Sequence, residues 1–208
     1  MSQSLIRVLI ADDHPIVRNG LILMLRYSAD LEIVGEASTG KEAVELYRQQ
    51  QPDVVLMDLR MPEMGGVEAI AIIRQEFSNA RILVLSTYDY DEDIYQGLQA
   101  GARGYLLKDI SMEVLHEAIR KVHVGQKYIP ADVAMKLAER LSSPQLTERE
   151  TQILELMVQG KSNAEMAGEL YISENTVKFH INNILIKLDV KNRGQAIVTA
   201  IQRGIIKV

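Results

Sequence analysis

The chain has 208 residues, which is enough for one large domain or two small ones. Apolar residues make up 47% of it and charged residues 25%, a balance that predicts a buried core and excludes a disordered chain. There is no cysteine, which excludes a disulfide framework and a thiolate metal site.

Nothing in the sequence indicates a membrane protein or an exported one. No run of about 18 apolar residues is present. The first residues, Met1 to Ser4, lead into an apolar run without the cationic and apolar segments of a signal peptide. We therefore expect no membrane partner and a cytoplasmic location.

The net charge of −5 is spread unevenly along the chain. Residues 145–208 hold 8 Lys and Arg against 7 Asp and Glu, a net charge of +1, and residues 1–144 hold the other 15 and 21, a net charge of −6. A nearly neutral C-terminal third does not by itself indicate nucleic-acid binding, so the placement of its charges must decide.

Short apolar runs alternate with helical patterns through the first 124 residues. This alternation predicts a parallel sheet with helices on both faces. Thr39 with Glu42 forms a capping-box pattern at the start of the second helix. The expected strands are 5–11, 31–36, 53–58, 81–86 and 104–107, and the expected helices are 15–27, 40–50, 66–76, 91–100 and 111–124.

Polar side chains stand at the carboxyl ends of these strands, where open parallel sheets bind their ligands. They are Asp12, Asp13, Asp58, Ser86 and Lys108. Clustered carboxylates repel one another at neutral pH, and a hard cation such as Mg²⁺ relieves that repulsion. Asp58 is then placed to attack a phosphoryl group, with Lys108 neutralising its charge and Ser86 donating a hydrogen bond to it.

Each of these residues has an ordinary structural explanation when it is taken alone. A carboxylate at a strand end is usually a turn former or a helix cap, and Asp13 or His14 would suit the helix that begins near Pro15. A single lysine such as Lys108 is more often solvated than catalytic. The prediction of a site therefore rests on the joint pattern.

A helical segment separates this part from the last third of the chain. Gly125 ends the fifth helix, residues 131–141 form an amphipathic helical pattern, and Ser142-Ser143-Pro144 breaks it. We therefore expect a first domain at 1–124, a helical linker at 125–144 and a second domain at 145–208.

Four helix starts follow in residues 145–208, which predicts an all-α domain. Each start carries N-cap chemistry: Thr147 with Glu150, Ser162 with Glu165, Ser173, and Asn192 with Gln195. The turn between the second and third helices, residues 170–173, is as short as a helix-turn-helix requires.

The third of these helices has two distinct faces. Val177, Ile181, Ile184, Leu185 and Leu188 form a core-facing stripe, and Asn175, Lys178, Phe179, Asn182 and Ile186 lie opposite. Lys178 and Asn182 suit guanine and adenine edges in a major groove, and Phe179 suits a thymine methyl group. The residues better placed for phosphates are Thr176, Asn183, Lys187 and Lys191.

The alternative for this domain is a four-helix module that binds another protein through a solvated polar face. Its near-neutral charge favours that alternative. Phe179 and Ile186 argue against it, because a face without a partner rarely exposes large apolar groups. A DNA-shift assay separates the two.

Residues 1–124 resemble the receiver domain of bacterial two-component response regulators. The matching motifs are Ala11-Asp12-Asp13-His14, Met57-Asp58-Leu59-Arg60-Met61-Pro62 with Gly65-Gly66, Val84-Leu85-Ser86-Thr87, and Gly101 to Lys108. The resemblance implies a sheet in the order 2-1-3-4-5 and transfer of a phosphoryl group to Asp58 from a sensor histidine kinase.

The resemblance also implies roles for the site residues. The Mg²⁺ ligands it implies are Asp13, Asp58 and the Arg60 carbonyl, with Asp12 assisting through water. Ser86 and Lys108 would sense the phosphoryl group. Tyr105 matches an aromatic whose rotamer is coupled to Ser86; a half-buried strand aromatic is the plain alternative.

Residues 145–208 closely resemble the LuxR-type helix-turn-helix. The matching motifs are Leu146 to Glu150, Gly160 to Ala167, Ile172 to His180 and Lys187 to Arg193. Together with the receiver-like first part, this makes the whole chain resemble the NarL/FixJ class of response regulators. The resemblance implies base contacts near Lys178, Phe179 and Asn182, and a homodimer, on phosphorylation or on DNA, through Val198 of the last helix.

Three positions depart from the LuxR-type pattern. Asp189 stands where glycine is frequent, Gly194 where Thr or Ser is frequent, and Met166 where Ile is common. We expect Asp189 to repel the DNA backbone. A glycine inside a helix costs about 1 kcal/mol relative to alanine, so Gly194 would weaken the last helix.

The sequence thus predicts a phosphorylation-regulated, DNA-binding transcriptional regulator. We expect a phosphoacceptor that catalyses only its own phosphorylation and slow dephosphorylation, and not an enzyme. A Mg²⁺-dependent phosphatase would need an acid two residues after its nucleophile, where this chain has Arg60. Two further hypotheses are a DNA binder with a silent receiver and a signalling adaptor whose second domain binds protein.

Two bulky residues lie two positions beyond site residues: Arg60 after Asp58, and Tyr88 after Ser86. We hypothesise that they shield the acyl phosphate from water and slow its hydrolysis. Unchanged decay rates in Arg60→Ala and Tyr88→Ala variants would remove this hypothesis.

Overall fold

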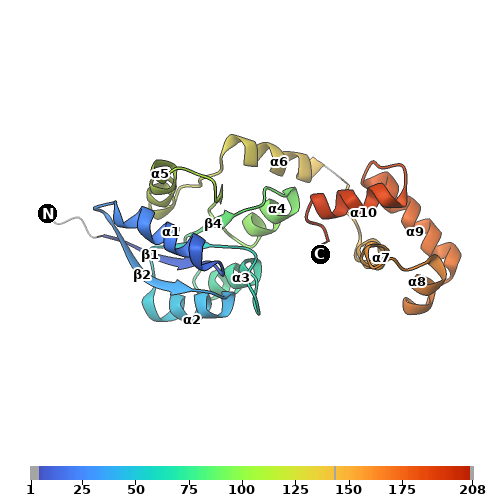
Figure 1. Ribbon diagram of the computed structural model, residues 1–208, viewed down its shortest axis with the longest axis horizontal. Coiled ribbons are helices and arrows are strands. Elements are labelled where there is room, and N and C mark those ends of the chain that lie inside the picture. Colours follow the sequence, from blue (N-terminus) through green and yellow to red (C-terminus); the bar gives the residue numbers. More distant parts are fainter. Residues whose placement is uncertain (1–4, 143, 207–208) are drawn as a thin grey trace. The chain divides into compact units, whose positions relative to one another are not determined.

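The computed structural model describes residues 5–142 and 144–206, so expectations that touch residues 1–4, Ser143 and 207–208 lie outside it. The described residues form two compact units, and the main division of the chain falls between Leu137 and Ala138. Figure 1 shows one unit with a central sheet and one made of helices. Within the described ranges, no helix is both long enough and apolar enough to span a bilayer.

The first unit is built on five parallel strands in the order β2-β1-β3-β4-β5. They are β1 (Ile6–Ala11), β2 (Leu31–Ala37), β3 (Val54–Met57), β4 (Ile82–Ser86) and β5 (Gly104–Leu107). Every residue of β3 and β4 is buried, as expected for aliphatic strands covered on both faces. The expected fold class is confirmed, and strand limits lie within one residue of the expected ones.

Helices lie on both faces of the sheet (Figure 1), and the two apolar cores assign two of them to one face and three to the other. The first group is α1 (Pro15–Arg26) and α5 (Met112–His123), and the second is α2 (Gly40–Gln50), α3 (Gly66–Glu76) and α4 (Asp91–Gln99). Alternate residues of a strand point to opposite faces of the sheet. Val8 and Ile10 of β1 therefore share a core with the first group, and Leu9 and Ala11 share a core with the second.

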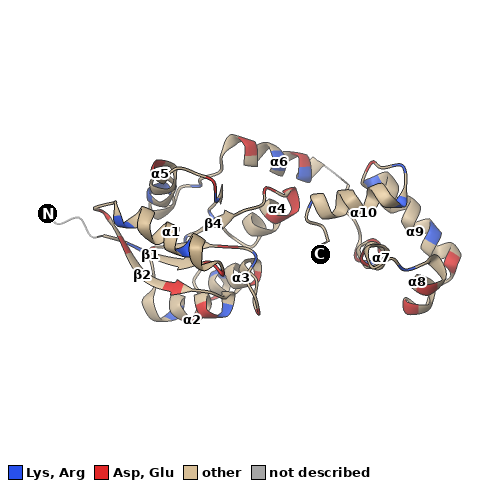
Figure 2. Cartoon of the chain, in the orientation of Figure 1, with Lys and Arg blue, Asp and Glu red and all other residues tan. Residues whose placement is uncertain are grey.

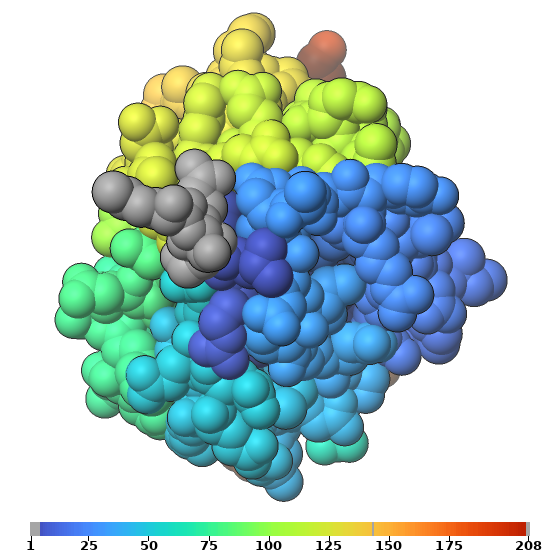
Figure 3. All heavy atoms as spheres, turned by 90° about the vertical axis from the view of Figure 1, so that its left-hand side faces the viewer, coloured from blue at the N-terminus to red at the C-terminus, as the bar shows by residue number. Residues whose placement is uncertain are grey.

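The strand register decides where the polar residues emerge. Ala11 lies opposite Met57, and Ser86 lies opposite Leu107. The residues that follow three of these four strand ends therefore leave the sheet at one edge; they are Asp12, Asp58 and Lys108. Figure 3 looks onto the other end of this unit, where the first described residues of β1 (dark blue) reach the surface.

The turn after β3 requires a glycine at position 66. A Cβ atom there would lie 2.0 Å from the Asp58 carbonyl oxygen, so any other residue would displace the backbone beside the site. The Gly66 N–H donates to the Leu59 carbonyl at 2.9 Å, which closes the turn directly behind Asp58.

The capping box expected at α2 is only half formed. The Thr39 hydroxyl accepts the Glu42 N–H, as expected. The Glu42 carboxylate, however, accepts the N–H and the hydroxyl of Ser38, at 2.7 and 2.8 Å, and not the Thr39 N–H. Two donors on one neighbouring residue outcompete the single backbone donor.

The first half of helix α6 (Ala131–Ser142) packs with the sheet unit. Val133 is 1% exposed, and Leu137 packs against the core beneath α2, α3 and α4. The Lys136 ammonium donates to the Asp89 carbonyl at 3.1 Å and pairs with the Asp89 carboxylate, just beyond β4. The sequence indicated a linker here but not this attachment.

The second unit is a bundle of four helices around its own apolar core. They are α7 (Glu148–Val158), α8 (Asn163–Glu169), α9 (Glu174–Lys187) and α10 (Arg193–Gln202). Both expected capping boxes, at Thr147 and Ser162, are complete. Ser173 and Asn192 cap the other two helices through their side chains, as expected.

Helix α9 ends at a residue in the left-handed region. Asp189 has φ +54°, and its N–H donates to the Ile186 carbonyl while Val190 N–H donates to Leu185. This is the Schellman arrangement, in which glycine is favoured at the position Asp189 occupies. The departure from the LuxR-type pattern at Asp189 thus falls at a position whose backbone geometry favours glycine.

We predict that Asp189→Gly raises the free energy of unfolding of the helical unit by up to about 1 kcal/mol, because glycine removes the left-handed strain. Chemical denaturation followed by circular dichroism measures this. Asp189→Asn is the matched control, since it removes the charge and keeps a Cβ atom. Equal stability of the Gly and Asn variants would assign the effect to charge and contradict the backbone explanation.

Candidate functional site

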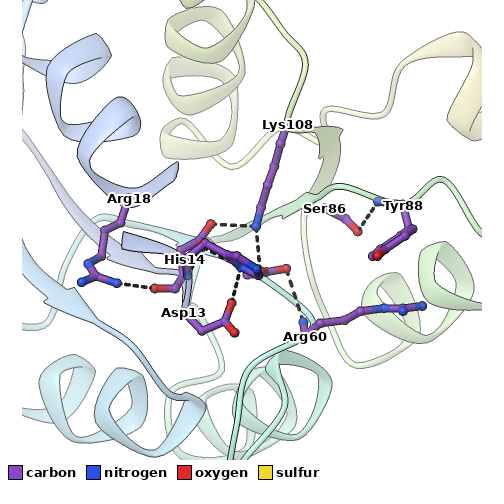
Figure 4. Close-up of polar contacts among 9 residues, drawn as sticks. Asp13, His14, Arg18, Arg60, Ser86, Tyr88 and Lys108 are labelled. Atoms are coloured by element: carbon purple, nitrogen blue, oxygen red, sulfur yellow. Dashed lines mark hydrogen bonds and ion pairs between the residues drawn. The ribbon is translucent and has the colours of Figure 1, made fainter. Parts of the chain in front are cut away.

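Three carboxylates meet at the carboxyl edge of the sheet (Figure 4). Asp12 follows β1 and is 1% exposed, Asp58 follows β3 and is 4% exposed, and Asp13 is half-buried. One ligand atom from each of them, and one from His14, all lie within 4.8 Å of one another. The strand ends expected to converge do so.

Lys108 joins two of these carboxylates. Its Nζ lies 2.6 Å from Asp58 Oδ2 and 2.8 Å from Asp12 Oδ2, and its side chain is 9% exposed. The Lys108 N–H donates to the Ser86 carbonyl at 2.9 Å, which fixes the start of its loop against β4. The lysine therefore approaches the cluster from a rigid strand end.

Burial and charge act in opposite directions on these groups. Burial raises the pKa of Asp58, and the hydrogen bond from Lys108 opposes this without cancelling it. Burial lowers the pKa of Lys108, but the bonds to Asp12 and Asp58 outweigh it and the pKa is raised. One ammonium thus faces three carboxylates, and negative charge at the cluster is incompletely neutralised.

The cluster fits a hard divalent cation. Its closely spaced carboxylate oxygens are the ligands that Mg²⁺ prefers, and the uncompensated charge attracts a cation. The His14 Nδ1 lies 2.7 Å from Asp13 Oδ1, but imidazole suits softer metals than Mg²⁺. Asp12, Asp13 and Asp58 are therefore the residues that could hold the ion.

Ser86 and Tyr105 meet at the backbone of Tyr88. Ser86 is 1% exposed, and its Oγ accepts the Tyr88 N–H at 3.1 Å. Tyr105 is fully buried, and its hydroxyl donates to the Tyr88 carbonyl at 2.9 Å. Burial raises the pKa of Tyr105, so this hydroxyl keeps its proton at neutral pH. The half-buried environment considered for Tyr105 is therefore wrong.

The Arg60 side chain points away from the cluster. Its backbone N–H faces Asp58 Oδ1 at 3.3 Å, but its guanidinium lies 4.2 Å from the Tyr88 ring centroid and 3.0 Å from Asp93 Oδ2. Figure 4 shows this side chain running toward Tyr88 and away from Asp13. Asp93 is fully buried, so this ion pair holds the guanidinium against α4.

Sequence reasoning missed two residues of this region. Arg18 Nη1 donates to the Asp12 carbonyl at 2.7 Å and holds the loop after β1. Asp93 anchors Arg60 from α4. The available signal for Asp93 was its place beside Ile94 at the start of the helix, on the side that becomes buried.

Helix α9 exposes the side chains that were expected to read bases. Lys178 and Asn182 are exposed, and Phe179 is 61% exposed. On the opposite side Val177, Ile184 and Leu188 are buried, whereas Ile181 and Leu185 are only partly buried. Figure 2 shows Lys and Arg on α9 and on the turn that precedes α10.

The expected phosphate contacts are not equally available. Lys191 is exposed, and Thr176 and Asn183 are partly exposed. Lys187, however, lies 2.7 Å from Glu150, which is 3% exposed, so its ammonium is engaged inside the unit. Burial by itself would raise the pKa of Glu150, but the hydrogen bonds from Lys187 and Thr147 outweigh it and the pKa is lowered. Val198 of α10, the residue expected at a dimer contact, is 53% exposed.

Two family profiles match the chain. The profile described as response regulator receiver domain matches residues 8–120, and that of the bacterial regulatory proteins, luxR family, matches residues 144–200. The chain therefore belongs to the two-component response regulators in which a receiver precedes a LuxR-type helix-turn-helix, the NarL/FixJ arrangement. Members of this class are DNA-binding regulators of transcription.

Individual relatives match the chain over nearly its whole length. The response regulator protein VraR of Staphylococcus saprophyticus is 39% identical over 97% of this chain and 99% of its own. The uncharacterized transcriptional regulatory protein YxjL of Bacillus subtilis is 38% identical over the full length of both. Among solved structures, response regulator ChrA of a heme-sensing two-component system is 38% identical, covers 98% and 100% of the two chains, and has a TM-score of 0.60.

A relative solved with DNA has the same architecture. The structure of the two-component response regulator RcsB in complex with DNA matches 96% of this chain and 99% of its own, with 25% identity and a TM-score of 0.72.

We predict that Asp58→Asn stabilises the protein at neutral pH. The raised pKa means that the folded state binds more protons than the unfolded chain between the two pKa values, so stability falls as the pH rises through that window. Removing the charge should therefore raise the free energy of unfolding at pH 7 and leave it unchanged below the ordinary Asp pKa.

Thermal melts of the wild type and the variant at several pH values test this. Asp132→Asn is the matched control, because that residue is exposed on α6 and should change stability by no more than about 0.5 kcal/mol. A stabilisation independent of pH would contradict the electrostatic explanation.

Proposed function

We propose that Asp58 is the phosphoacceptor of this response regulator and that a sensor histidine kinase supplies the phosphoryl group. The observation that supports this most is the contact of one buried lysine, Lys108, with both Asp58 and Asp12. A carboxylate that must meet an incoming anion needs a fixed cation beside it. The geometry supplies one at hydrogen-bond distance.

In the proposed transfer, an Asp58 oxygen bonds to phosphorus while the phosphorus–nitrogen bond of the donor breaks and the nitrogen keeps the electron pair. Lys108 already holds Oδ2 and would neutralise charge on the transferred group. Ser86 accepts through its Oγ from Tyr88, so its own O–H can donate to a phosphoryl oxygen. The protein would catalyse only its own phosphorylation and slow dephosphorylation.

We assign the metal site to Asp12, Asp13, Asp58 and the Arg60 carbonyl, with Asp12 acting through water. Mg²⁺, when bound, neutralises charge on the phosphoryl oxygens. The carboxylate spacing supports the first three residues. The Arg60 carbonyl rests on the family pattern.

The proposed switch is the loop between β4 and α4. Ser86 and Tyr105 both bond to the Tyr88 backbone, so a shift of Ser86 toward a phosphoryl group would move the same segment that Tyr105 holds. Asp89, the next residue, pairs with Lys136 of α6. Phosphorylation would thus bias two arrangements of this loop and of the helix leading to the second unit.

In the second unit, we propose that α9 enters the major groove of double-stranded DNA. Lys178, Phe179 and Asn182 would contact bases, and Val198 of α10 would contact the second protomer of a homodimer. Thr176, Asn183 and Lys191 would contact phosphates, with Lys187 contributing only if it leaves Glu150. The assigned domains are 1–124 and 145–208, joined by 125–144, and the assigned location is the cytoplasm.

Incubation with acetyl phosphate and Mg²⁺ should add one phosphoryl group to the intact mass of the wild type. Asp58→Ala should add none, and omission of Mg²⁺ should abolish the addition. If a cognate kinase also failed to modify the wild type, the receiver would be a dimerising module, and a phosphorylation-independent DNA binder would replace this proposal.

We predict that Asn182→Ala and Lys191→Ala weaken DNA binding in different ways. Loss of Asn182 should cost about 1–3 kcal/mol on an operator selected from random DNA and little on unrelated DNA, because base contacts specify. Loss of Lys191 should weaken both equally and reduce the salt slope by about 1 per protomer.

Binding isotherms at several salt concentrations distinguish these outcomes. Glu155→Ala, an exposed position on α7, is a control that leaves α9 intact. No DNA shift at any salt concentration would favour the protein-binding adaptor.

A further inference from the structure

The backbone and the side chain of Arg60 contact two different regions, the backbone N–H the carboxylate of Asp58 and the guanidinium Tyr88 and Asp93. Its backbone N–H lies 3.3 Å from Oδ1 of Asp58, the carboxylate that would carry the phosphoryl group. Its guanidinium lies instead against the Tyr88 ring, at 4.2 Å, and donates to Asp93 Oδ2 at 3.0 Å. The charged group therefore lies against Tyr88 and α4.

Asp93 is well suited to hold that guanidinium. Its side chain is 1% exposed, whereas that of Arg60 is 32% exposed. An ion pair with one fully buried member is screened little by water, and the aromatic face of Tyr88 adds a cation–π contact. If the Arg60 guanidinium left Asp93 for a phosphoryl group in a more open site, the buried Asp93 carboxylate would lose this cation.

Arg60 is only two residues from Asp58, and its backbone N–H lies 3.3 Å from Asp58 Oδ1, so its side chain starts beside the phosphoryl position. A guanidinium released from Asp93 is therefore placed to turn toward the phosphoryl group. Its planar fork of donors matches phosphate oxygens better than any other side chain. In the structure, Asp93 holds the guanidinium in the first of these two positions, against Tyr88 and α4.

We propose that Asp93 is a positioning residue that holds the Arg60 guanidinium off the phosphoryl group and thereby shortens the lifetime of the acyl phosphate. This rests on the proposed role of Asp58. It also limits the shielding hypothesis: Arg60 covers the phosphoryl group only when Asp93 no longer holds it.

The reaction concerned is hydrolysis of the acyl phosphate. A water oxygen bonds to phosphorus, the bond from phosphorus to the Asp58 oxygen breaks, and Asp58 leaves as a carboxylate while the water protons go to phosphate and solvent. A guanidinium on the phosphoryl oxygens pairs with their charge before the reaction and occupies the space through which water approaches. Both effects slow the decay.

The test is the half-life of the phosphorylated full-length protein. Wild type, Asp93→Asn, Arg60→Ala and the double variant are loaded with acetyl phosphate and Mg²⁺, desalted, and followed by intact mass. Asp93→Asn should lengthen the half-life roughly three- to tenfold. In the Arg60→Ala background, the same change at Asp93 should alter it by less than about twofold.

Asp91→Asn is the matched control, because it removes the same charge from α4 and leaves the Arg60–Asp93 pair in place. A half-life that is not lengthened in Asp93→Asn, or a lengthening that persists without Arg60, would overturn the proposal. A wild type that accepts no phosphoryl group would instead defeat the proposed function on which it rests.

A measurement on the wild type covers the case in which Asp93→Asn does not fold. Nuclear Overhauser contacts from the Arg60 guanidinium protons to the Asp93 Cβ protons should persist when beryllofluoride and Mg²⁺ occupy the site, even if the Tyr88 loop moves, because the guanidinium stays with Asp93. Loss of those contacts on beryllofluoride binding would show that the guanidinium leaves Asp93 without any substitution and would overturn the proposal.

Discussion

The contact of Lys108 with Asp12 and Asp58 is the interaction on which the rest of the receiver depends. It places one buried ammonium among three carboxylates at the edge of a sheet whose strands are held in register by an aliphatic core. The arrangement is unbalanced in charge, and burial raises the pKa of Asp58. The repulsion among its carboxylates is relieved when a cation binds or when Asp58 is modified. This sensitivity to the state of Asp58 is what a switch requires.

The consequences of such a change pass through one short loop. Tyr88 accepts from Tyr105 and donates to Ser86, its ring supports the Arg60 guanidinium, and its neighbour Asp89 holds Lys136 of α6. Contacts from four separate segments of the chain thus meet on two adjacent residues. In the proposed switch, a small displacement there would change the packing at α4 and α6 together, because packed side chains have discrete arrangements rather than continuous ones.

Residues 145–208 carry a net charge of only +1, which gives the helical unit little electrostatic attraction for DNA. Lys187 and Lys161 are engaged by Glu150 and Glu169 within the unit, which leaves the exposed Lys178 and Lys191 near the reading face. Asp189 adds a negative charge beside Lys191. In the proposed mode of DNA binding, weak backbone attraction per protomer would make dimerisation and base contacts the main sources of affinity, in keeping with the proposed control of DNA binding by phosphorylation.

The sequence by itself determined the fold class, because strand and helix periods, caps and strand-end residues are local properties that the chain displays directly. It also indicated Asp12, Asp13, Asp58, Ser86 and Lys108 as one group, since parallel strands bring their carboxyl ends to one edge. Tertiary structure alone decided the partners of long side chains: Arg60 with Asp93, Lys187 with Glu150 and Lys136 with Asp89. Those choices depend on which elements pack together, and a flexible charged side chain carries no signal of that in its own neighbourhood.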